Sequence, residues 1–295
     1  EQNPTADGRS SGIGLAMPCS NVPKALSFST TDSDDSPEIE SPCSLQSGSD
    51  TSVVKSVFLV RHGEALHNVA EKRAMQQALD ENDVKDEELK KEVLEIARKS
   101  VLTDENLKDA PLSEKGQEQA ATTAANIEKI VLEDTDLKAP EAVFVSPLQR
   151  ALQTAALMFP RHNRVHVRDL LRERCTGFPC DERSQVPSLQ SRKSFCHMRF
   201  DQVDDVADLD FEPPLFRRFN TWPLIEEKST LRQRTTGLGR LLQGTSADSV
   251  CIVTHKGFLR ELERGPLGRP DASEFSNCEV RVYDVSVCEG EIFRA

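Results

Sequence analysis

Four basic side chains of this 295-residue sequence stand at or shortly after apolar runs typical of buried strands: Arg61, His62, Arg150 and His255. A phosphoryl group in transfer needs fixed positive donors around its oxygens and a nucleophile in line with the leaving oxygen. Arg61, Arg150 and His255 can be the donors. A histidine can be the nucleophile, because one neutral ring nitrogen attacks phosphorus while the other is held by a hydrogen bond. These residue types therefore favour phosphoryl transfer.

Alternating strands and helices must position these side chains. Apolar runs predict strands over residues 53–60, 142–145, 165–167 and 250–253, and a last strand at a sheet edge over 280–287. Helical spacing predicts helices over about 71–100, 113–131, 148–156 and 230–242, with Ser146 and Pro147 opening the third of them. The order predicts a three-layer α/β/α sandwich with a mostly parallel sheet, in which ligands bind beyond the carboxyl ends of the strands.

The domain organisation follows from a change in composition and apolar patterning near residue 53. Residues 1–52 hold 12 Ser, 5 Pro and 4 Gly without an apolar period, which predicts a disordered, acidic tail. Residues 53–295 are expected to form the folded domain, with insertions at about 71–108 and 178–230. The second insertion is rich in proline and is expected to lie as a loop-rich cover over the active site.

Composition excludes several classes of partner. The net charge of −12 disfavours nucleic acid as a partner, since phosphate backbones are bound by basic side chains. No run approaches the roughly 20 apolar residues of a membrane span, so no membrane association is expected. Eight cysteines spread over a long chain favour reduced thiols and an intracellular, cytoplasmic setting. An organelle stays open if a targeting peptide has been removed before Glu1.

Five sequence blocks together resemble the histidine phosphatase superfamily, also called phosphoglycerate-mutase-like, whose hallmark is Arg-His-Gly after the first strand. The blocks begin at Val60, Asp109, Ser146, Arg172 and Thr254 and follow the order and spacing of that family. The resemblance implies that His62 is the nucleophile that becomes phosphohistidine and that Glu173 is the proton donor. It also implies that the phosphate pocket is formed by Arg61, Arg150 and His255.

Asn68 resembles a family residue near the phosphate, although an asparagine that caps the following helix is an equal alternative. No cofactor is expected, because protein cations take the place that metals occupy in other phosphatases. No structural metal is expected either, since the gaps between Cys175, Cys180 and Cys196 lack the short paired spacing of common zinc sites. His67, with His162 and His166, is interpreted as a surface or packing histidine.

The substrate is expected to be a small anionic phosphorylated metabolite, because residues 141–200 hold ten Lys plus Arg against five acids. Arg174 and Arg183 are the substrate-binding candidates, and the pair Arg217 and Arg218 could clasp a carboxylate as in mutases. The block Cys180-Asp-Glu-Arg183 resembles the phosphoglycerate-mutase-like phosphatases of plants and fungi, which favours phosphomonoester hydrolysis. Mutase-type phosphotransfer and a noncatalytic phosphate-binding protein remain alternatives. The oligomeric state is not set by the sequence.

Overall fold

A computed structural model describes residues 52–82, 85–203 and 225–295 of the chain. The tail expected to be disordered falls, apart from Ser52, outside the described residues, and so do Arg217 and Arg218. The expected insertion at 178–230 is therefore described only in part, and both insertions remain proposals.

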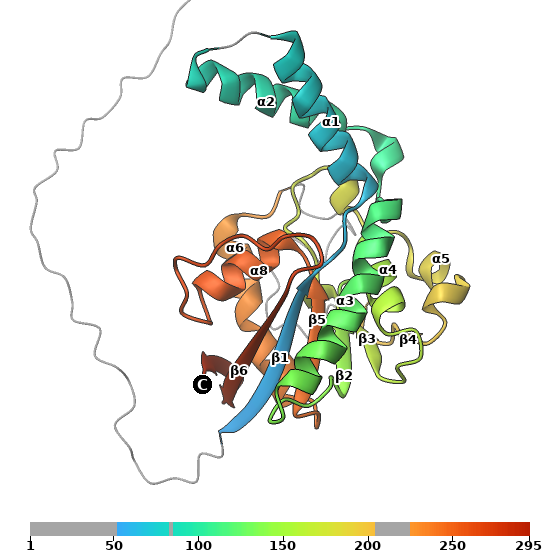
Figure 1. The fold of residues 1–295 in the computed structure, drawn as a ribbon, viewed down its shortest axis with the longest axis vertical. Coiled ribbons are helices and arrows are strands. Elements are labelled where there is room, and N and C mark those ends of the chain that lie inside the picture. The colour runs from blue at the N-terminus through green and yellow to red at the C-terminus, as the bar shows by residue number, and fades with distance from the viewer. Residues whose placement is uncertain (1–51, 83–84, 204–224) are drawn as a thin grey trace, which may run out of the picture. The chain divides into compact units, whose positions relative to one another are not determined.

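A seven-stranded sheet in the order β4-β3-β2-β5-β1-β6-β7 organises the described residues (Figure 1). Its strands are β1 (Val53–Arg61), β2 (Ala142–Val145), β3 (Val165–Val167), β4 (Met198–Arg199), β5 (Ser249–Thr254), β6 (Val280–Cys288) and β7 (Glu291–Arg294). The pairs from β4 through β1 are parallel, whereas β6 runs antiparallel to both β1 and β7. The predicted mostly parallel α/β sheet is confirmed.

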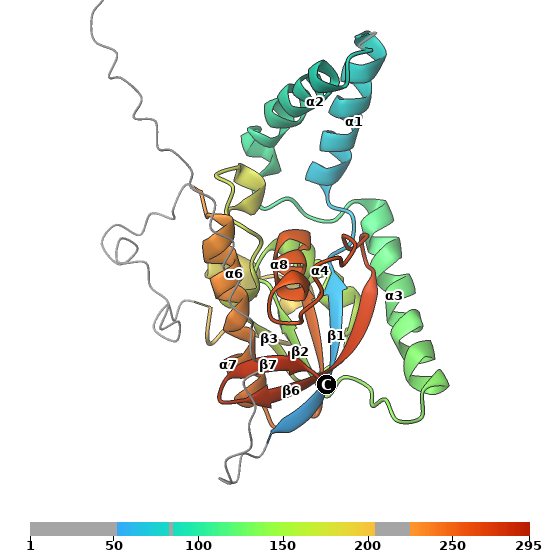
Figure 2. The same cartoon turned by 90° about the vertical axis from the view of Figure 1, so that its left-hand side faces the viewer.

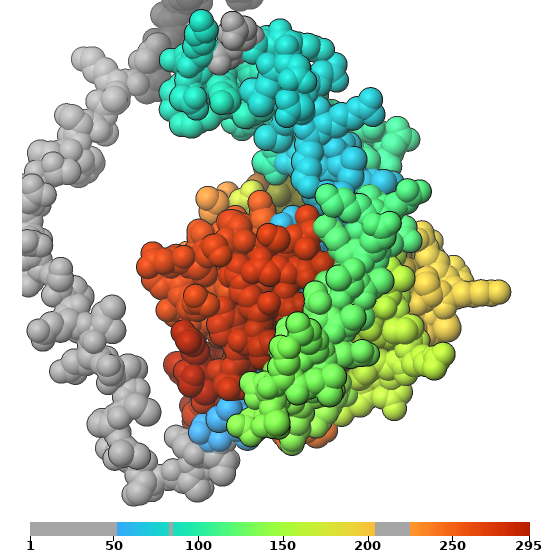
Figure 3. Space-filling model, viewed as in Figure 1, coloured from blue at the N-terminus to red at the C-terminus, as the bar shows by residue number. Residues whose placement is uncertain are grey.

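Eight α-helices accompany this sheet within the described residues: α1 (Leu66–Glu81), α2 (Glu87–Leu102), α3 (Glu114–Glu133), α4 (Gln149–Met158), α5 (Val186–Gln190), α6 (Lys228–Thr236), α7 (Leu238–Gln243) and α8 (Lys256–Arg264). Helices α3 and α4 lie against one face of the sheet, and α6, α7 and α8 lie against the other (Figure 2). In the space-filling view, α3 in green adjoins the orange-to-red C-terminal segment (Figure 3). These are the three layers that the alternating pattern predicted.

Strand β1 shows how the sheet is buried on both faces. Successive side chains of a strand point to opposite faces, so a central strand of a covered sheet is apolar throughout. Phe58 and Val60 belong to the core cluster under α3 and α4. Val57 and Leu59 belong to the cluster under α6, α7 and α8. The strand is thus locked in register, which fixes the position of the residues at its carboxyl end.

Three sequence predictions about the elements were wrong. The helix expected over 71–100 is two helices, and the second begins where the Asp86 carboxylate accepts the Leu89 N–H at 2.9 Å. The helix expected over 230–242 is interrupted at Gly237, where a Cβ would meet Leu170 at 3.0 Å. Strand β6 is not an edge, because β7 pairs with its outer side. The sequence did not indicate β7, because a strand of four residues is too short to show a clear alternation of apolar and polar side chains.

Candidate active site

His62 and His255 leave two neighbouring parallel strands at the same edge of the sheet. Arg61 of β1 stands opposite Thr254 of β5, and the His62 N–H donates to the Thr254 carbonyl at 3.0 Å. The two imidazole rings therefore lie close together, with centroids 5.0 Å apart and planes inclined at 56°. Both side chains are buried. The sheet thus brings together two of the residues that the sequence selected.

The His62 ring is oriented by its own backbone. Its Nδ1 lies 2.7 Å from the Gly63 carbonyl oxygen, which can only accept a hydrogen bond. The proton of the neutral ring is therefore on Nδ1, and Nε2 keeps a free lone pair. Burial lowers the pKa of His62 well below its usual range, and the cations of Arg150 and Arg61 lower it further. His62 is thus a neutral imidazole with an available nucleophilic nitrogen.

Gly63 is required for this turn by close packing. A Cβ at this position would lie 2.5 Å from the Gly116 carbonyl oxygen, which belongs to the first turn of α3. The Gly63 N–H donates to the Thr154 hydroxyl of α4 at 3.0 Å. Helices α3 and α4 therefore hold the backbone that follows the nucleophile candidate.

His255 is held by Ser146, and this corrects the sequence prediction for that serine. Helix α4 begins at Gln149 rather than at Pro147, with Leu148 as its cap residue. The Ser146 hydroxyl instead lies 2.7 Å from His255 Nε2 and accepts the Leu148 N–H at 3.3 Å. His255 Nδ1 is buried and has no hydrogen-bond partner within the described residues. Burial lowers the pKa of His255 well below its usual range, with Arg150 adding to the effect.

Arg150 stands in the first turn of α4 and is almost completely buried, with 1% of its surface exposed. Its Nη1 donates to the Cys180 carbonyl at 2.6 Å, and its Nη2 donates to Asp181 Oδ1 at 3.1 Å. Its Nε is buried and unpaired in the described part of the chain. The start of α4 is itself fixed by Asp109, whose carboxylate accepts the Gln149 N–H at 2.8 Å and the Ser184 N–H at 2.9 Å.

Arg61 is anchored by the loop between α8 and β6. Its Nη1 donates to the Phe275 carbonyl at 2.6 Å, while its Nε is buried and finds no partner among residues 52–82, 85–203 and 225–295. The same loop supplies Asn277, whose amide donates to the His62 carbonyl at 3.1 Å. Burial lowers the pKa of Arg61, and Glu173 opposes this change.

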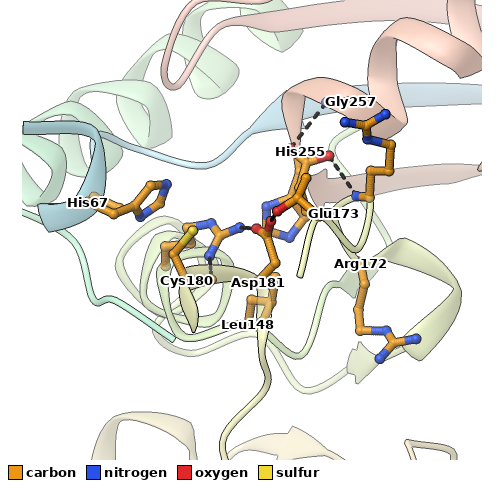
Figure 4. Close-up of polar contacts among 12 residues, drawn as sticks. His67, Leu148, Arg172, Glu173, Cys180, Asp181, His255 and Gly257 are labelled. Carbon is orange, nitrogen blue, oxygen red and sulfur yellow. Dashed lines mark hydrogen bonds and ion pairs between the residues drawn. The ribbon is translucent and has the colours of Figure 1, made fainter. Parts of the chain in front are cut away.

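Glu173 follows a short 3₁₀ turn over Asp169–Leu171 and reaches the start of α8. Its carboxylate accepts the Gly257 N–H at 3.2 Å and the Arg174 N–H at 2.9 Å (Figure 4). A Cβ on Gly257 would lie only 2.2 Å from Glu173 Oε1, so a larger residue there would displace the carboxylate. Arg234 holds the loop that carries Glu173. Its guanidinium donates to the carbonyls of Leu170, Arg172 and Glu173 and forms an ion pair with Glu226 at 2.9 Å.

The remaining sequence candidates lie in different places. The Asn68 amide accepts the Ala65 N–H at 3.1 Å, so the hydrogen bonds support the helix-capping alternative for this residue. Arg174 is half-buried, and its backbone N–H binds the neighbouring glutamate. Arg183 faces Asp169, with its Nε 3.8 Å from the carboxylate. The labelled Arg172 side chain in Figure 4 points away from His255.

Two residues that the sequence did not assign to the phosphate pocket also lie at the site. His67 is buried, its ring centroid lies 6.5 Å from that of His62, and burial lowers its pKa to about 2. The Asn68 amide lies 2.9 Å from His67 Nε2, and His67 Nδ1 is buried without a partner in the described residues. Asp181 is the second, because it bonds Arg150 directly. The usable signals were the position of His67 in the helix after His62 and the acid within the Cys180–Arg183 block.

The described residues hold no group of three or more His, Cys, Asp or Glu side chains arranged to bind a metal ion. Across the same residues, no helix is long and apolar enough to cross a membrane.

Comparison with known proteins identifies a family and similar solved structures. The family model described as histidine phosphatase superfamily (branch 1) matches residues 103–292. A search of curated proteins finds no match.

Three of the solved structures to which this chain is similar are the following. A mycobacterial glucosyl-3-phosphoglycerate phosphatase is 18% identical with a TM-score of 0.46, over 82% of this chain and 97% of that one. The phosphoserine phosphatase of Entamoeba histolytica is 17% identical with a TM-score of 0.41, over 78% and 94%. YhfR of Bacillus stearothermophilus is 19% identical with a TM-score of 0.43, over 81% and 95%.

Proposed function

This chain is an enzyme of the histidine phosphatase superfamily (branch 1), and we propose that it is a phosphomonoesterase acting through a phosphohistidine at His62. The supporting observation is a set of unpaired nitrogens: Arg61 Nε, Arg150 Nε and His255 Nδ1 are buried without hydrogen-bond partners in the described residues. Buried polar groups nearly always have a partner, so three such nitrogens around one imidazole favour a bound anion. A phosphoryl group has the charge and the acceptor oxygens to pair all three.

In the first step, His62 Nε2 attacks phosphorus, the new N–P bond forms, and the ester P–O bond breaks. The two guanidinium groups stabilise the charge on the phosphoryl oxygens. His255 can donate from Nδ1 when the Ser146 hydroxyl donates to its Nε2, since the neutral ring then carries its proton on Nδ1. The leaving alkoxide takes a proton from Glu173, because an alkoxide is a poor leaving group unless it is protonated.

In the second step, a water molecule attacks the phosphohistidine. The Glu173 carboxylate accepts a proton from this water, the N–P bond breaks, and its electron pair returns to His62 Nε2. Inorganic phosphate leaves, and the starting protonation states are restored. The two backbone N–H groups on Glu173 keep its carboxylate at one place in both steps.

The substrate proposed is a small phosphorylated metabolite with further negative charge. The excess of basic residues over residues 141–200 supports this class, and Arg174 stays our candidate for contact with the rest of the substrate. Arg183 is a weaker candidate, because Asp169 faces its guanidinium. The resemblance of the Cys180–Arg183 block to plant and fungal phosphatases is our reason to favour hydrolysis over transfer.

The experiment incubates the full chain with a panel of phosphomonoesters that includes phosphoglycerates, sugar phosphates and phosphoserine, and scores free phosphate against isomerised product. We expect free phosphate and a phosphohistidine that can be trapped by rapid acid-free denaturation. Isomerised product without phosphate release would establish the mutase alternative. Binding of phosphate without turnover of any ester would establish a noncatalytic protein.

A further inference from the structure

The guanidinium of Arg150 is held at both terminal nitrogens by two consecutive residues. Cys180 contributes its carbonyl to Nη1 at 2.6 Å, and Asp181 contributes Oδ1 to Nη2 at 3.1 Å. The guanidinium is planar with its donors in a fixed fork, so two bonds to the terminal nitrogens also set the direction of Nε. That Nε is the nitrogen left unpaired in the described residues.

Asp181 is itself fixed. Its second oxygen, Oδ2, accepts a hydrogen bond from the Thr176 hydroxyl, and only 8% of its side chain is exposed. In Figure 4 the labelled Asp181 lies between Cys180 and Glu173, with its side chain directed toward the site. Both carboxylate oxygens therefore have a partner, and the chain Thr176–Asp181–Arg150 connects the loop over the site to the phosphate-binding candidate.

We propose that Asp181 is a positioning residue that holds the Arg150 guanidinium in the orientation that presents Nε to the phosphoryl group. This inference rests on the proposed function. It assigns Asp181 no proton transfer and no contact with the substrate; its effect passes through Arg150. Thr176 supports it by fixing the carboxylate, and Cys180 completes the fork with a backbone oxygen that substitution does not remove.

A purely structural ion pair is the alternative explanation. Burying two charges carries a large desolvation cost before their attraction is counted, so a buried pair by itself is weak evidence of stabilisation. This pair also lies next to a second carboxylate. Burial raises the pKa of Asp181, Glu173 adds to the rise, and Arg150 opposes it. Asp181 is thus held near Glu173 and bonded to Arg150. Orientation of the Arg150 guanidinium explains this placement better than stabilisation of the fold does.

The experiment compares Asp181→Asn with Asp181→Leu, which are neutral and similar in size. Asparagine keeps an oxygen for Arg150 Nη2 and an N–H for Thr176, whereas leucine keeps neither. The dissociation constant of inorganic phosphate is measured by calorimetry, and kcat and KM are measured with an aryl phosphate. We expect Asp181→Leu to bind phosphate about 10-fold more weakly than Asp181→Asn and to lose more in kcat than in KM, because small misplacements of a positioning group are costly.

The decisive arm repeats the comparison in an Arg150→Ala background. If Asp181 acts through Arg150, the difference in phosphate affinity between asparagine and leucine disappears there. A difference that persists without Arg150 would show a structural role and overturn the inference. Equal phosphate affinity and equal kcat for the two variants in the presence of Arg150 would overturn it as well, because the two variants share only the loss of the ionisable carboxyl group.

Two further variants complete the test. Glu182→Gln is the matched control, since this neighbouring carboxylate pairs with Lys108 at the surface and its loss should leave phosphate binding unchanged. If Asp181→Leu does not fold, as shown by its melting curve, Thr176→Val against Thr176→Ser replaces it. We then expect an effect of about 3-fold in the same direction, and no difference would overturn the inference. Failure of the wild-type chain to bind phosphate would instead contradict the proposed function.

Discussion

The sheet edge and the segment over residues 169–184 contribute to the same site in different ways. At the sheet edge, His62 and His255 follow paired strands and are placed by the register of β1 and β5. Across the site, Glu173 and Asp181 stand on irregular backbone with only short 3₁₀ turns. Their carboxylates are placed by contacts from distant segments, namely the start of α8 and the start of α4. The proposed nucleophile is thus positioned by regular structure, and the two acidic side chains by tertiary hydrogen bonds.

The largest effect is expected at the sheet edge. His62→Ala removes the proposed nucleophile, and we expect turnover to fall by at least about 10⁴-fold with no phosphoenzyme formed. Stopped-flow phosphate release and trapping of labelled phosphoenzyme check this result. Because the side chain lies beyond the strand end, the melting temperature should change little. Normal turnover by this variant would exclude His62 as the nucleophile.

Glu173→Gln tests the irregular segment, and we expect a large decrease in rate only for some substrates. We expect phosphoenzyme formation from alkyl phosphates to slow by roughly 10² to 10⁴-fold, because the leaving alkoxide loses its proton donor. Aryl phosphates should be affected much less, since a phenolate leaves without protonation. The rate of the first step, measured by rapid quench, is the quantity to compare. Equal slowing for both ester classes would assign the acid role to another carboxyl group.

Gly257→Ala asks whether the tertiary contact places that acid. The added Cβ would lie 2.2 Å from Glu173 Oε1, so the carboxylate must move. We expect kcat for alkyl phosphates to fall by about 10 to 100-fold, in line with the cost of misplacing a catalytic group. Gly244→Ala is the matched control, because its Cβ would meet Arg240 only at 3.4 Å. Unchanged kcat in Gly257→Ala would mean that the contact does not position Glu173.

The smallest effect concerns stability and tests His67 of α1, the buried histidine next to the sheet edge. Burial lowers the pKa of His67 to about 2, so it stays neutral in the folded chain while the unfolded chain takes up a proton below about pH 6.5. The unfolded state then binds more protons, and stability falls as pH falls. We expect about 1 kcal/mol of this loss per such histidine between pH 6.5 and pH 5.5.

The variant that tests this linkage is His67→Gln, compared with the wild-type chain at both pH values. Other titrating groups are common to the two proteins and cancel in the difference. The variant should lose about 2 to 4 °C less in melting temperature on acidification. An identical acid-induced drop in both proteins would show that His67 is not neutral in the folded state.

The limits of the sequence prediction appear in particular residues. Ser146 before Pro147 has the local pattern of a helix cap, yet its hydroxyl binds His255, which is 109 residues away. His67 sits in the first turn of α1, where the sequence left a surface and a packing role open, and the structure buries it beside His62. Asp109 caps α4 from another part of the chain. Local patterns cannot distinguish a side chain that serves its own helix from one that serves a distant group.

The sequence by itself determined the sheet and the residues at its carboxyl edge. Apolar runs of strand length identify the central strands, and parallel strands must present their following residues at one edge, so Arg61, His62 and His255 had to converge there. Only the tertiary structure decided which groups hold Arg150 and Glu173. Those contacts join an irregular segment to the starts of α4 and α8, 31 and 84 residues away in the sequence. They depend on packing between layers, which leaves no period in the sequence.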